Sequence, residues 1–267
     1  MAVRQPSVAI SHVSSIQRHP LAVFFVATIL AGWLFSAVAS LLLSNPIILP
    51  LVALPISYAP AVMAWIMLRV AGTPDERRLA RQRLLNLPVD WHWLIVAVLI
   101  LPAMHTISIL LGALFGGRVP FHPLMLILLP AYLLTNLGEE ISWRGYALPK
   151  LQSRHSPLAS GLIVGVMWAL FHVVAMAQNK QDTLVYVVVG SVVLIDMSVI
   201  IAWLFNRTNS VPLTTLTHAM YDVVAIAVMP LIETGSPLTA LALGTAVDTI
   251  PALGVAIATH GRLGKHG

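Results

Sequence analysis

Three clusters of ionisable side chains lie inside or at the ends of long apolar stretches of this sequence. They are Glu139, Glu140 and Arg144; His172; and His218 with Asp222. A charged group inside a membrane is energetically costly, so residues of this kind usually serve a function. Carboxylates and imidazoles can activate a water molecule, protonate a leaving amine and stabilise an oxyanion, as peptide hydrolysis requires.

The spacing within the first cluster indicates that its two glutamates have different roles. Glu140 and Arg144 are four residues apart, so a helix places them on one face, where they can form an ion pair. Glu139 then points about 100° away from Glu140. It is therefore free for another task.

A stripe of side chains predicts which way His172 faces. Gly161, Gly165, Trp168 and His172 follow one another at helical spacing, and the two glycines form a GxxxG pattern. Such a pattern lets a neighbouring backbone approach closely. We therefore expect His172 to face the interior of a helix bundle rather than lipid.

The third cluster forms a polar stripe, in which Thr214, His218 and Asp222 follow at intervals of four residues. Measured from the predicted starts of their spans, His218 lies about 10 Å deep and His172 about 20 Å deep. A helix tilt of about 20° or more, or a shifted start of the span that carries His172, would bring the two residues to a common depth.

The elements that position these residues are apolar stretches of about 20 residues, the length that spans a bilayer. Hydrophobic residues make up 58% of the chain and charged residues only 9%, against about 25% charged in soluble domains. We predict an all-α, polytopic transmembrane helix bundle that forms one domain over residues 1–267. Its eight predicted spans are 21–44, 48–70, 92–116, 121–146, 158–178, 184–205, 211–232 and 237–259.

The basic residues predict the topology. If the N-terminus is cytoplasmic, 13 of the 15 Lys and Arg residues lie on the inner side, as the positive-inside rule requires. Both termini are then inside. We read the formal net charge of +5 as a contact with anionic membrane lipids rather than with nucleic acid. We expect an integral protein of a bacterial inner membrane.

The inner loop over residues 72–90 has a pattern of its own. Thr73 and Glu76 predict a capping box, and Pro74 suits the first helical position. Arginines alternate with leucines after it. The loop is either an amphipathic juxtamembrane helix that holds anionic lipid on the cytoplasmic surface or a solvated basic connector.

The three clusters resemble the motifs of the CPBP family of intramembrane proteases, and they follow one another in the same order as in that family. That family includes the CAAX prenyl endopeptidase and many bacterial bacteriocin-immunity (Abi) proteins. Glu139 to Arg144 matches EExxxR, Trp168 to His172 corresponds to FxxxH, and His218 to Asp222 matches HxxxD. The resemblance covers residues 120–230. Trp168 replaces the Phe of the motif, a difference that we expect to change packing more than chemistry.

The resemblance implies roles for these residues. Glu139 and His172 would activate water, while His218 and Asp222 would hold the oxyanion or a metal. Glu140 and Arg144 would support Glu139. The family has been described both as metalloproteases and as glutamate-dependent enzymes, and the sequence leaves that choice open.

If zinc takes part, its ligands would be His172, His218 and Asp222. We expect no organic cofactor. With no cysteine in the chain, a thiolate site and a cysteine nucleophile are excluded.

We therefore expect an intramembrane endopeptidase that hydrolyses a peptide or membrane-protein substrate near the cytoplasmic membrane face. The alternative is a non-catalytic bacteriocin-immunity or scaffold protein that binds a peptide or partner in the same cavity. A transporter is disfavoured because no matching pair of broken helices is present. Asp196 is expected to be a buried hydrogen-bonding acid outside the site, and His105 and Asp248 to be interfacial or packing residues.

Overall fold

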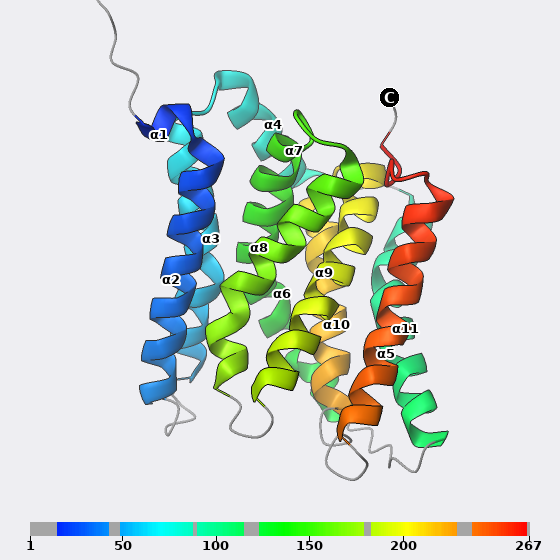
Figure 1. Ribbon diagram of the computed structural model, residues 1–267. Helices are drawn as coiled ribbons and strands as arrows, with labels where there is room; N and C mark the ends of the chain where they lie inside the picture. Colours follow the sequence, from blue (N-terminus) through cyan, green and yellow to red (C-terminus); the bar gives the residue numbers. More distant parts are fainter. Residues whose placement is uncertain are drawn as a thin grey trace, which may run out of the picture.

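The computed structural model describes residues 15–42, 49–87, 90–114, 123–178, 183–228 and 237–265, whose regular structure is entirely helical (Figure 1). In chain order the helices are α1 (Ser15–Arg18), α2 (Pro20–Leu42), α3 (Leu49–Val70), α4 (Pro74–Leu85), α5 (Trp91–Leu114), the 3₁₀-helix η1 (Pro123–Leu128), α6 (Leu129–Ser142), the π-helical turn η2 (Trp143–Ala147), α7 (Leu148–Leu151), α8 (Pro157–Ala177), α9 (Thr183–Thr208), α10 (Val211–Val228) and α11 (Pro237–Ala258).

Three of these helices are long and apolar enough to cross a membrane, over Pro20–Leu41, Pro157–Ala177 and Thr183–Thr208. Shorter apolar helical stretches occur in α3, α5 and α11 within the described residues. The expectation of an all-helical membrane protein is confirmed. The number of spans and the orientation of the bundle stay predictions.

The long helices close a circuit around the bundle interior. Each packs against its neighbours in the order α2, α3, α6, α10, α5, α11, α9 and α8, and α8 packs back against α2. Side chains from α6, α8 and α10 can therefore meet inside the circuit, although α6 and α8 lie on different sides of it.

One end of the bundle gathers the segments that the charge pattern assigns to a single side. Figure 1 shows α1, α4, α7 and the C-terminal end of α11 at this end. Glu76 of α4 pairs with Lys150 of α7, and the Leu158 N–H donates to the Gly261 carbonyl (3.1 Å). The predicted capping box of α4 is confirmed, because Thr73 and Glu76 bond reciprocally.

The predicted fourth span is not a uniform α-helix, since it starts as a 3₁₀-helix and contains a π-turn just after the Glu pair. Pro149 explains the π-turn, because it has no N–H to donate to the Gly145 carbonyl. The Leu148 N–H bonds instead to Trp143, five residues back. Arg83 of α4 donates to the free Gly145 carbonyl (3.3 Å).

Two glycines allow the close helix contacts that set the position of the site. A Cβ at Gly165 of α8 would lie 2.8 Å from the Ile195 Cα of α9, and a Cβ at Gly138 of α6 would lie 2.5 Å from the Ser57 carbonyl oxygen of α3. A larger residue at either position would push the neighbouring helix away. The close approach predicted from the GxxxG pattern is confirmed at Gly165.

Candidate active site

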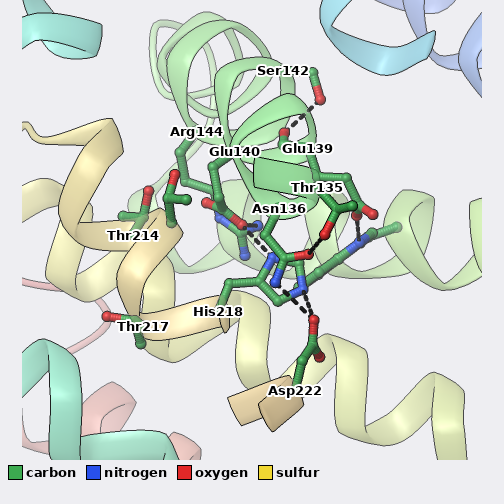
Figure 2. A network of polar contacts seen from close by, with 12 residues as sticks. Thr135, Asn136, Glu139, Glu140, Ser142, Arg144, Thr214, Thr217, His218 and Asp222 are labelled. Atoms are coloured by element: carbon green, nitrogen blue, oxygen red, sulfur yellow. Dashed lines mark hydrogen bonds and ion pairs between the residues drawn. The ribbon is translucent and has the colours of Figure 1, made fainter. Parts of the chain in front are cut away.

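The two glutamates of the first cluster lie side by side on α6 and face different neighbours. Glu139 contacts Trp168 and His172 of α8, whereas Glu140 contacts Arg144 and His218. Glu139 and Glu140 therefore point in different directions from α6 and have different neighbours, as predicted (Figure 2). Both residues are buried.

Glu139 is held from two directions. The indole Nε1–H of Trp168 donates to Glu139 Oε2 at 2.6 Å. The Ser142 hydroxyl donates to the Glu139 backbone carbonyl, also at 2.6 Å. The other carboxylate oxygen, Oε1, faces His172 Nε2 at 3.9 Å. That distance is longer than a direct hydrogen bond.

The ring of His172 is oriented by its own helix. Its Nδ1 lies 3.0 Å from the Trp168 carbonyl oxygen. A carbonyl oxygen only accepts, so Nδ1 carries the proton of this hydrogen bond. In the neutral imidazole, Nε2 is then the unprotonated nitrogen, and it points at Glu139.

Glu140 and Arg144 form the predicted ion pair, with Nη1 2.8 Å from Oε1 and both side chains 0% exposed. The same Glu140 oxygen lies 3.2 Å from His218 Nδ1. The Arg144 guanidinium also lies over the Trp168 ring, 4.6 Å from its centroid. This buried pair ties α6 to α10 and to the indole that holds Glu139.

The third cluster faces the same space. His218 Nε2 lies 3.6 Å from Asp222 Oδ2, and the His218 ring meets the Trp168 ring edge-on with centroids 4.9 Å apart. Asn136 of α6 donates to Asp222 Oδ2 at 2.7 Å (Figure 2). The sequence did not single out Asn136 as a site residue. Its position three residues before Glu139, on the same helix face, is the signal that could have done so.

Trp168 makes a polar contact as well as packing contacts, and its effect on the chemistry stays a prediction. Its indole N–H bonds directly to Glu139, which the Phe of the family motif could not do. Trp168 also links the two helices that carry the histidines. It lies one turn nearer the start of α8 than His172, and its ring reaches both Glu139 and His218.

Two carboxylic acids lie outside this group. Asp196 of α9 accepts a hydrogen bond from Thr249 of α11 at 2.6 Å, which agrees with the role expected for it. Asp248 is buried in α11. The side chain of His105 lies outside the described residues.

Two side chains of the site are partly exposed, while Glu139 is buried. The side chain of Glu139 is 7% exposed, but that of His172 is 29% exposed and that of Asp222 is 27% exposed. A small molecule can therefore approach the edge of the site at His172 and Asp222.

The residues proposed as zinc ligands do not form a ligand group as they stand. The described residues contain no group of three or more His, Asp or Glu side chains arranged to hold a metal ion. The Nδ1 and Nε2 atoms of His218 face Glu140 and Asp222, and His172 Nδ1 bonds to a backbone carbonyl.

Comparison with known proteins agrees with the three motifs. Residues 120–224 match the family described as type II CAAX prenyl endopeptidase, Rce1-like. The chain is also 27% identical over 224 residues to a CAAX prenyl protease 2 from Methanococcus maripaludis, an alignment that covers 76% of this chain and 80% of the relative. These two similarities agree with the resemblance of the three motifs to the CPBP family of intramembrane proteases, and they indicate a peptide hydrolase.

Proposed function

We propose that this protein is an intramembrane endopeptidase in which Glu139 and His172 activate the attacking water. The observation that carries the proposal is the pair itself. Glu139 Oε1 and His172 Nε2 come from two helices and face each other at 3.9 Å inside the bundle. Groups at such a separation are commonly joined by one water molecule that bonds to both.

The proposed reaction uses one water molecule for each peptide bond. Glu139 accepts a proton from the water as its oxygen forms a bond to the scissile carbonyl carbon. The carbonyl oxygen becomes an oxyanion. As the C–N bond breaks, the proton passes to the leaving amine, directly or through His172, and Glu139 returns to the carboxylate. The products are a carboxylic acid and an amine.

His218 is the proposed oxyanion donor. Its Nδ1 faces the Glu140 carboxylate, which accepts a hydrogen bond from that nitrogen and orients the ring. Its Nε2 points into the space beside Asp222, where an N–H can donate to the developing negative charge. Asp222, held by Asn136, keeps this ring in position.

The remaining polar groups position Glu139. Trp168 fixes one carboxylate oxygen, so that the other points at His172. Arg144, which is paired with Glu140, places its guanidinium over the Trp168 ring. A group kept in place before the substrate arrives loses little entropy during the reaction.

We propose that cleavage takes place near the cytoplasmic face. The Glu pair lies close to the end of α6, which continues through η2 and α7 to the end of the bundle that carries the basic helix α4. The positive-inside rule assigns that end to the cytoplasm. The substrate would be a peptide or membrane protein, and the relative's name makes a CAAX-type C-terminal peptide the first one to test.

The test is hydrolysis by purified Glu139→Gln protein in lipid nanodiscs. The probes are one CAAX-type peptide in farnesylated and unmodified forms, with products identified by mass spectrometry. Removing a general base costs about 10²–10⁴-fold in rate. Asp196→Asn is the matched control, since it neutralises another buried carboxylate outside the site. Wild-type rates in the Glu139→Gln variant would refute the proposed mechanism.

A second readout addresses the non-catalytic immunity or scaffold alternative. Under that alternative, Glu139→Gln protein would retain its full biological effect in cells. Under the proposed function, it would lose that effect together with hydrolysis.

A further inference from the structure

Helix α4 forms one wall of a hollow at the end of the bundle. The hollow has a volume of about 630 Å³, and it is lined by Arg78, Arg81, Gln82, Leu85, Asn86 and Asn209. This volume falls in the range of small-molecule binding sites, about 300–1,000 Å³. None of these residues belongs to the site described above.

The walls of the hollow are fixed by hydrogen bonds. Asn86 Nδ2 donates to the Thr208 carbonyl oxygen at 2.8 Å, and the Ser210 hydroxyl donates to the Asn86 carbonyl oxygen at 2.5 Å. Arg83 Nε donates to Asn209 Oδ1 at 3.3 Å. These bonds join the end of α4 to the turn between α9 and α10. The hollow is therefore preformed.

The arginines of α4 divide into engaged and available groups. Arg77 donates to the carbonyls of Leu68 and Gly72, and Arg83 is held at the α9–α10 turn. Arg78 pairs with Asp75 at 3.1 Å, but their side chains are 62% and 79% exposed, and such pairs are weak.

Arg81 has no hydrogen bond or ion pair with any described residue. The lining thus presents two guanidinium groups, that of Arg81 without a described partner and that of Arg78 in an exposed ion pair, and the lining residues include no carboxylate.

Exposed apolar side chains follow this basic surface along the chain. Leu85 lines the hollow, and Leu87 and Trp91 follow it along the chain before α5 enters its apolar stretch. These three residues are 66%, 72% and 72% exposed. Tryptophan is enriched where a protein crosses the headgroup region. A ligand that suits both surfaces has an anionic head and an apolar tail.

We propose that this hollow binds the phosphate of an anionic phospholipid headgroup. The forked guanidiniums of Arg78 and Arg81 would hold the phosphate oxygens, and Gln82 and Asn209 would donate further hydrogen bonds. Leu85, Leu87 and Trp91 would lie against the upper acyl chain. A free phosphate or a peptide carboxylate has the same anionic chemistry, but neither would use these apolar residues.

Native mass spectrometry of the full chain tests this inference, with phosphatidylglycerol and phosphatidylcholine titrated separately. We expect selective retention of phosphatidylglycerol, reduced about fivefold by Arg81→Gln and about 25-fold by the Arg78→Gln/Arg81→Gln double variant. Arg154→Gln is the control, because it removes the same charge from an exposed loop at the same end. None of the α4 residues is buried, so the variants should fold.

Competition arms identify the source of the anion. Inorganic phosphate and a short peptide with a free C-terminal carboxylate should not displace the lipid, and an amidated peptide serves as the reference. Equal retention of the two lipids would overturn the proposal. So would an equal loss in Arg154→Gln, or displacement by either competitor.

Discussion

Replacing Glu140 by Gln should reduce stability far more than replacing its neighbour Glu139. Glu140 and Arg144 are both 0% exposed and 2.8 Å apart. Gln keeps the shape of the side chain and an oxygen that can accept from His218, so the substitution isolates the charge. Removing one member of a buried pair typically costs about 3–5 kcal/mol, because the other charge is left uncompensated.

The surroundings of Arg144 decide where in that range the cost falls. Its Nε and Nη2 atoms have no hydrogen-bond partner among the described residues, and after the substitution the Trp168 ring would still lie against its guanidinium. A cation–π contact contributes about 0.5–2 kcal/mol, which does not replace a carboxylate. We therefore expect a loss of at least about 3 kcal/mol in Glu140→Gln. This corresponds to a fall in melting temperature of about 6–12 °C for a domain of this size.

Thermal unfolding of the purified variants in one detergent measures this difference. Glu139→Gln should unfold near the wild-type temperature while its rate of hydrolysis falls about 10²–10⁴-fold. A Glu140→Gln/Arg144→Met double variant should recover much of the stability lost in Glu140→Gln, because it removes the guanidinium that would otherwise be left without its carboxylate. If Glu140→Gln unfolds like wild type and Glu139→Gln does not, the supporting and catalytic roles have been assigned the wrong way round.

Three further predictions test individual contacts. Trp168→Phe should lower stability by about 1.5–3 kcal/mol, which is the value of a hydrogen bond to a charged group. The variant should retain hydrolysis because the CPBP motif has Phe at this position. An unchanged melting temperature would show that the bond to Glu139 does not contribute to stability. Gly165→Ala should lower the stability by about 1–3 kcal/mol, because the added Cβ would be overpacked against Ile195. Gly161→Ala should be tolerated, because its added Cβ would lie 3.4 Å from the nearest atoms. Equal melting temperatures of the two variants would contradict this prediction. Hydrolysis should persist after treatment with a chelator, because the ring nitrogens of His218 face two carboxylates. If the chelator abolishes activity, added zinc restores it, and His218→Ala binds less zinc, a zinc-dependent mechanism would be established instead.

Contacts within one helix were predictable from residue spacing. The pairing of Glu140 with Arg144, the capping box of α4 and the polar seam from His218 to Asp222 all depend on neighbours three or four residues apart. The period of the helix sets these distances whatever surrounds it. Long apolar stretches likewise predicted an all-helical membrane protein.

For contacts between helices, the sequence predicted only that the three motifs converge on one site, and not which side chains bond to each other. The bonds from Trp168 to Glu139 and from His218 to Glu140 join residues 29 and 78 positions apart. The hydrogen bonds from Asn136 to Asp222 and from Trp168 to Glu139 were not foreseen.

The sequence by itself thus determined the helices and the chemical groups that each helix face carries, because both follow from local periodicity and from transfer into lipid. Tertiary structure decided which faces meet. Tilt, rotation and the close approach at Gly165 and Gly138 place α6, α8 and α10 so that a glutamate, an indole and two histidines converge. These quantities depend on the packing of all helices together, which no single segment encodes.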